Sequence, residues 1–134
     1  MFVLDEMLDG ISADVLDKAA QVVYLGTSLP DCARRADVVL PITNVAEEDG
    51  SFMNRDCRVQ RYLQAKSAPG MARPAWWVLS EIMAQMGDGE PFTDASQAFD
   101  AIGEEVSAFS GLSYDELGYG GKVVALQRTA EVSV

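Results

Sequence analysis

The hydrophobic positions in the first part of the chain fall into three short continuous runs, Phe2–Met7, Val22–Gly26 and Val38–Ile42. Such runs are typical of strands that are buried on both faces of a parallel sheet. Between them, Ser12–Ala20 has apolar residues at helical spacing, and Leu29–Ala36 is expected to form a second, shorter helix. The resulting β-α-β-α-β order predicts right-handed crossovers and a layered α/β fold.

The pattern changes after Pro41, where no sustained period follows, although Arg58–Leu63 alternate as a strand does. The predicted fold class is therefore α/β: a partial parallel-sheet unit, followed by an irregular loop or hairpin and two to three helices. We place the α/β part at residues 1–66, including the loop Gly50–Gln60. Residues 67–134 are predicted to form a mainly helical C-terminal extension.

Two helices and a last strand are predicted within this extension. Pro74 suits the first position of a helix that ends at Gly87. Apolar residues at helical spacing indicate a second helix over Asp94–Phe109. The apolar run Val123–Gln127 is expected to form the last strand.

Composition narrows the class of protein. The 134 residues are 49% hydrophobic and 23% charged, as in an ordinary globular domain. No apolar run approaches the roughly 20 residues that span a bilayer, and the start of the chain lacks a basic signal region, so we expect a cytoplasmic chain without membrane insertion. The sequence has no histidine, and Cys32 and Cys57 form no C-x-x-C motif. These facts argue against a self-contained metal site or a Ser-His-Asp triad, and we expect no catalytic residue and no metal ligand.

Charge is distributed unevenly along the chain. The net charge is −11, which argues against nucleic acid as a partner. Yet the stretch Arg55–Arg73, here called the basic island, carries five basic residues and a single acid, Asp56. Three acids, Glu47–Asp49, stand shortly before it. Neighbouring acids in a loop are usually solvated, so we favour that interpretation over a metal site.

The arginines of the basic island allow two interpretations. Guanidinium groups bind phosphates and carboxylates with paired hydrogen bonds, so Arg55, Arg58 and Arg61 could hold a phosphorylated cofactor. Equally, these arginines could pair with Glu47–Asp49 across a turn and brace the loop. The residues alone leave both interpretations open.

A longer pattern of residues resembles the molybdopterin oxidoreductase superfamily. The resemblance covers most of residues 22–120, and residue types, order and spacing agree. The matching segments are ADVVLP at Ala36–Pro41, the acids and glycine at Glu48–Gly50, Asn54, the R-V-Q at Arg58–Gln60, and PGMARPAW at Pro69–Trp76. The chain departs from the pattern at Ser51, where threonine is usual, at Cys57, where glycine is usual, and at Pro30–Cys32, in place of Thr-Glu-Thr.

The later segment FSGLSYDELG, Phe109–Gly118, is similar to the tail of one branch of the superfamily. That branch is the large iron–sulfur subunit of bacterial respiratory complex I, an NADH-quinone oxidoreductase. The resemblance implies a non-catalytic scaffold, expected to be a fragment of such a subunit, in which this chain binds no cofactor and iron–sulfur clusters lie elsewhere. Its partners would be the remainder of that large subunit and other peripheral-arm subunits, at the cytoplasmic side of the inner membrane.

The resemblance also implies an alternative within the same superfamily. In formate dehydrogenase-like molybdenum enzymes, the corresponding segment surrounds a molybdopterin guanine dinucleotide. Under this alternative, Asn54, Arg58 and Gln60 are the cofactor-binding residues. A third interpretation, independent of the family, is a stand-alone acidic interaction module.

Overall fold

The computed structural model describes residues 1–4 and 13–125 of the chain, and its first unit is a parallel sheet. The strands β1 (Phe2–Leu4), β2 (Val23–Gly26) and β3 (Val38–Pro41) lie in that order and all run parallel. The helix α1 (Ala13–Lys18) connects the first two strands, and the 3-10 helix η2 (Asp31–Arg35) connects the second and third. The predicted β-α-β-α-β unit is thus confirmed.

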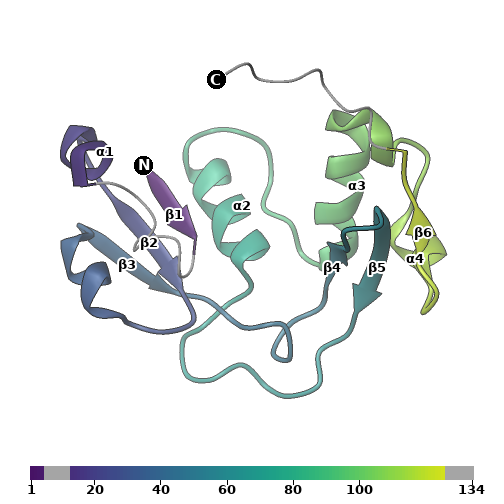
Figure 1. Cartoon of the computed structure of the whole chain (residues 1–134), viewed down its shortest axis with the longest axis horizontal. Coiled ribbons are helices and arrows are strands. Elements are labelled where there is room, and N and C mark those ends of the chain that lie inside the picture. Colours follow the sequence, from purple (N-terminus) through teal and green to yellow (C-terminus); the bar gives the residue numbers. More distant parts are fainter. Residues whose placement is uncertain (5–12, 126–134) are drawn as a thin grey trace.

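The second unit is an antiparallel sheet. β4 (Gly50–Met53) and β5 (Arg58–Tyr62) form a hairpin, and β6 (Lys122–Val123) pairs with the other edge of β5. The parallel sheet and this hairpin lie at opposite ends of the long axis of the molecule (Figure 1). The predicted last strand is confirmed only in its first residue, because Val124 and Ala125 are not part of a strand and its last two residues lie outside the described residues. The boundary proposed after residue 66 stays a prediction.

Two longer helices follow the hairpin. α2 (Ala75–Gln85) lies between the two sheets in Figure 1, and α3 (Ala95–Glu105) lies beside the hairpin. The short helices η3 (Ser107–Phe109) and α4 (Tyr114–Leu117) complete the helical part. The predicted sequence of a loop or hairpin followed by two to three helices is confirmed. Within the described part of the chain, no helix has the length and apolarity needed to cross a bilayer.

Two predicted elements need correction, and a third lies partly outside the described residues. The helix expected over Leu29–Ala36 is a 3-10 helix that starts only after Pro30, whose extended backbone (ψ 162°) precludes an earlier start. The helix expected to reach Phe109 ends at Glu105, because the chain folds back and packs the Phe109 ring against Phe99, 6.1 Å away in an edge-on arrangement. The strand predicted over Phe2–Met7 is seen only at its start, since its later residues lie outside the described ones.

The expectation that all three parallel strands are buried on both faces holds only for the central one. Tyr24 and Leu25 of β2 point to opposite faces, and both are fully buried. In the edge strands, by contrast, Phe2, Leu4 and Val38 are exposed by 38–53%. The cause is position, because an edge strand of a three-stranded sheet has a neighbour on one side only.

One carboxylate joins the two sheets. Glu48 accepts a hydrogen bond from the hydroxyl of Thr43, just after β3, and another from the hydroxyl of Tyr62 at the end of β5 (2.9 Å). The indole N–H of Trp76 in α2 donates to the backbone oxygen of the next residue, Asp49 (3.2 Å). The loop between β3 and β4 is therefore held by both sheets and by α2.

We predict that Tyr62→Phe changes both the stability of the protein and its pH dependence. Loss of the hydrogen bond to Glu48 should lower the free energy of unfolding by about 1 kcal/mol at neutral pH. Burial, and then the hydrogen bond to Glu48, raise the pKa of the Tyr62 hydroxyl well above its usual range. A raised folded-state pKa contributes stability that is present below the unfolded tyrosine pKa of about 10 and is lost as the pH rises beyond it.

Urea unfolding at several values between about pH 8 and about pH 11 checks this prediction. The wild-type protein should lose stability more steeply with rising pH than Tyr62→Phe does. Tyr119→Phe is the matched control, because Tyr119 is 84% exposed. Equal slopes for wild type and Tyr62→Phe would contradict the raised pKa.

Candidate functional site: the β4–β5 hairpin

The turn of the hairpin is built by Asn54. Its side-chain oxygen accepts the backbone N–H groups of Asp56 (2.9 Å) and Arg58 (3.0 Å), and its backbone oxygen accepts that of Cys57 (3.0 Å). Asparagine favours such turns because its side chain can replace a backbone acceptor. The first predicted site residue thus has a structural role, since its carbonyl oxygen is used within the turn.

Cys57, which stands where the resembling pattern has glycine, has an unusual backbone conformation. Its φ of 59° lies in the left-handed region, which costs a residue with a Cβ atom roughly 1–2 kcal/mol. Glycine adopts this conformation without that steric cost. The turn therefore has at this position a conformation that favours glycine, the residue in the pattern that the chain resembles, and a half-buried cysteine adopts it here.

The three predicted site residues share one face of the hairpin. In the antiparallel register Phe52 lies opposite Gln60, and the backbone N–H of Asn54 donates to the oxygen of Arg58 (3.0 Å). Because side chains alternate along a strand, Arg58, Gln60 and Tyr62 point to one face of β5. The structure thus brings together Asn54, Arg58 and Gln60. The same row includes Phe52, which sequence reasoning missed; pairing the two strands across the Asn54–Cys57 turn would have found it.

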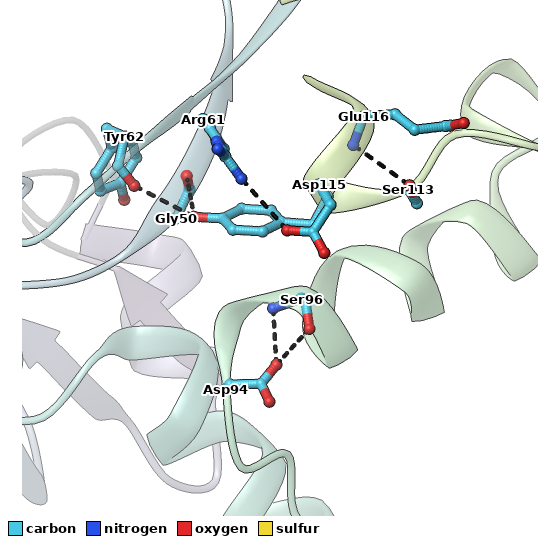
Figure 2. Close-up of polar contacts among 9 residues, drawn as sticks. Gly50, Arg61, Tyr62, Asp94, Ser96, Ser113, Asp115 and Glu116 are labelled. Atoms are coloured by element: carbon cyan, nitrogen blue, oxygen red, sulfur yellow. Dashed lines mark hydrogen bonds and ion pairs between the residues drawn. The ribbon is translucent and has the colours of Figure 1, made fainter. Parts of the chain in front are cut away.

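Arg58 and Arg61 point to opposite faces of β5 and have different surroundings. Arg61 forms an ion pair with Asp115 at 3.3 Å, and its guanidinium lies 5.8 Å from the ring centres of Tyr114 and of Tyr119 (Figure 2 shows the ion pair). Arg58 instead donates to the backbone oxygen of Gly120 (3.0 Å). Arg61 therefore fastens β5 to the C-terminal part, while the contact of Arg58 is with a neutral oxygen and does not neutralise its charge.

The helical part supports the hairpin from the face that carries Val59. This residue is buried in a core with residues of α3 and α4, among them Phe99 and Leu117. The hydroxyl of Tyr114 lies within hydrogen-bond distance of the backbone oxygens of Gly50 (3.1 Å) and Tyr62 (3.2 Å). One face of the hairpin is thus covered by the helical part, while on the other face Phe52 is 50% exposed and Arg58 contacts Gly120.

The helix that supplies much of this support has a well-formed start. The carboxylate of Asp94 accepts the backbone N–H groups of Ser96 (2.9 Å) and Gln97 (3.0 Å) and so caps α3, as Figure 2 shows for Ser96. The hydrogen bonds from Ser96 and from the backbone of Gln97 lower the pKa of Asp94. The cap fixes where α3 begins beside the hairpin.

The hypothesis that the arginines pair with the acids before them is wrong. Glu47 pairs with Lys66 (2.8 Å), and Asp49 accepts the backbone N–H of Gln64 (2.6 Å). The register gives the reason: Gly50 lies opposite Tyr62, so residues just before β4 face residues just after β5. Two of the arginines pair with other acids, Arg55 with Asp56 and Arg61 with Asp115.

Glu47 also departs from the solvated state expected for it. Its side chain is only 6% exposed, and it accepts the backbone N–H of Asn44 (3.1 Å) as well as the ammonium of Lys66. The hydrogen bond from Lys66 is the largest of the effects that lower the pKa of this carboxyl. Glu47 is therefore a charged structural residue at the base of the hairpin.

The acids also border a cleft of about 320 Å³ at the base of the hairpin, beside the starts of α2 and α3. Its wall combines the acidic Glu47, Asp49 and Asp94 with the basic Arg73, and Trp76 is its largest apolar residue. In residues 1–4 and 13–125, no three or more histidine, cysteine or acidic residues are grouped as metal ligands. The cleft offers mixed charges and no ligand set, so the hairpin face is the better candidate site.

Comparison with known proteins places this chain in a family. The sequence profile of the family "Molybdopterin oxidoreductase" matches residues 5–85, which include the hairpin and most of the parallel sheet. Because this match covers more than half of the chain, the chain belongs to the molybdopterin oxidoreductase family.

Individual relatives carry more specific names. The alpha subunit of F420-dependent formate dehydrogenase 2 from Methanococcus maripaludis is 41% identical over 95 residues, and that of F420-dependent formate dehydrogenase 1 from the same organism is 36% identical over 95 residues. Each match covers 69% of this chain and 14% of the relative. The matched part of this chain thus spans about one-seventh of the length of either relative.

We predict that Cys57→Gly stabilises the protein by about 1 kcal/mol, since glycine removes the steric cost of the left-handed conformation. Cys57→Ala is the control, because alanine keeps the Cβ atom and should bring no such gain. Thermal or urea unfolding of the three proteins measures the difference. If glycine and alanine have the same effect, the turn is not strained at this position.

Proposed function

We propose that this chain is part of a formate dehydrogenase-like molybdopterin oxidoreductase and that its hairpin faces the molybdopterin guanine dinucleotide. The observation that carries the proposal is that Arg58 and Gln60 share one half-buried face of β5 with Asn54 opposite Arg58, within the segment that the family profile matches. The relatives named formate dehydrogenases support the choice within the family.

The donors on this face fit such a cofactor in chemical type. The guanidinium of Arg58 donates to a neutral carbonyl, so its charge remains available to a phosphate. The side-chain amide of Gln60 offers both a donor and an acceptor, which suits the polar edge of a pterin or guanine. The bound cofactor would supply the redox chemistry, while Arg58 and Gln60 would hold and orient it.

The relatives support this alternative better than a scaffold role in the large iron–sulfur subunit of complex I. The similarity of Phe109–Gly118 to that branch covers ten residues beyond the segment that the family profile matches. The partner we propose is accordingly the remainder of a formate dehydrogenase-like enzyme. Its iron–sulfur clusters, where present, would lie in that remainder.

We predict that Arg58→Ala lowers the molybdenum or tungsten and pterin content of the assembled complex, because it removes the charged donor on the hairpin face. The complex is purified through a tag on this chain from cells that produce all its partners, and metal and pterin are measured per mole of chain. The loss of one charge-assisted contact should reduce retention of the cofactor about tenfold.

Arg55→Ala is the matched control, because Arg55 is 95% exposed and its contact with Asp56 spans 4.0 Å. This variant should retain the wild-type cofactor content. A wild-type complex with neither molybdenum nor tungsten nor pterin would overturn the proposed function. Equal cofactor content in Arg58→Ala and wild type would remove Arg58 from the proposed site.

A further inference from the structure

A half-exposed aromatic ring lies in the same row as the proposed cofactor-binding residues. Phe52 of β4 is 50% exposed and stands opposite Gln60 in the register of the hairpin. Directly opposite residues of an antiparallel pair point to the same face, with their Cβ atoms about 5 Å apart. The ring of Phe52, the amide of Gln60 and the guanidinium of Arg58 therefore belong to one surface, here called the ring platform.

The position of the Phe52 ring is fixed by its neighbour. The rings of Phe52 and Tyr62 have centroids 6.2 Å apart and planes inclined by 33°. Tyr62 is in turn held through its hydroxyl by Glu48, at 2.9 Å. A large apolar ring that is half in solvent, yet packed against a hydrogen-bonded tyrosine, is a pre-positioned surface rather than a freely moving side chain.

We propose that Phe52 stacks on the flat heterocyclic ring of the dinucleotide cofactor, while Arg58 and Gln60 bind its polar and phosphate groups. This inference rests on the proposed function and adds a cofactor-binding residue to it. An aromatic face stacks on any flat base, whereas the neighbouring guanidinium and amide select a ring that carries phosphate and hydrogen-bonding edges.

Charge supports this occupant over an apolar segment of a partner protein. The basic island stands out in a chain of net charge −11, and Arg58 follows the turn directly, within the platform. A phosphorylated ligand is attracted to such a local excess of positive charge. An apolar segment would have to desolvate Arg58 without offering it a partner.

Two substitutions at Phe52 separate stacking from simple apolar contact. Phe52→Leu keeps an apolar side chain but removes the π face, and Phe52→Trp keeps a flat aromatic face. Both are introduced into the tagged chain, and the assembled complex is purified and dialysed extensively. Pterin and acid-released guanine nucleotide are then measured per mole of chain, together with the melting temperature of the complex.

We expect Phe52→Leu to retain about tenfold less pterin and nucleotide than wild type, as expected when a base loses its aromatic partner. Phe52→Trp should retain the wild-type amount and melt as the wild type does, and both variants should assemble as the wild type does. Tyr119→Leu is the control, because Tyr119 is an exposed aromatic on the opposite side of β5, near Arg61.

Two results overturn the ring platform. If Phe52→Leu keeps its cofactor while Arg58→Ala loses it, Phe52 does not stack, and the proposed function stands. If Phe52→Leu lowers assembly or melting temperature and Phe52→Trp fails to restore cofactor content, the role of Phe52 is structural. A wild-type complex without metal, pterin or nucleotide is a different failure, since it overturns the proposed function itself.

Discussion

The carboxylate of Glu48 connects the two halves of this fold. It accepts hydrogen bonds from Thr43, which follows the parallel sheet, and from Tyr62, which ends the hairpin. A half-buried carboxylate is costly unless its oxygens have partners, so this arrangement favours one orientation of the hairpin relative to the sheet. Tyr114 contacts the hairpin at the same end, through the backbone oxygens of Gly50 and Tyr62.

Side chains alternate along β5, so Arg58 and Arg61 of the basic island point to opposite faces of this strand. Arg61 points to the C-terminal part, where Asp115 and two tyrosine rings surround it. Arg58 points to the opposite face and donates to a neutral carbonyl. Both arginines thus contact the C-terminal part, Arg61 through an ion pair with Asp115 and Arg58 through a hydrogen bond to a backbone oxygen that does not neutralise its charge.

Much of the fold could be predicted from the sequence, because continuous apolar runs and helical spacing report burial directly. The parallel unit, the strand at Arg58–Tyr62 and the helix after Pro74 all follow from such patterns. The partners of the charged residues could not be predicted, because they depend on register. One fact, that Gly50 pairs with Tyr62, directs Glu47 to Lys66 and away from the arginines.

The arrangement of the candidate site also depends on strand register, which the sequence does not reveal. The family pattern points to Asn54, Arg58 and Gln60, but only the paired strands place them on one face together with Phe52. The left-handed backbone of Cys57 could likewise not be predicted from composition. The glycine at this position in the resembling pattern is the one sequence feature that indicates it. Exposure in the edge strands β1 and β3 was missed because a sequence pattern does not reveal which strands lie at an edge.

The central claim is that the open face of the hairpin contacts a dinucleotide cofactor. An experimental structure of the assembled complex, determined with its cofactor bound, tests this most directly. The account predicts cofactor atoms within hydrogen-bond distance of the side chains of Arg58 and Gln60. A structure in which this face is covered by protein, or in which the cofactor lies beyond the reach of both side chains, would contradict it.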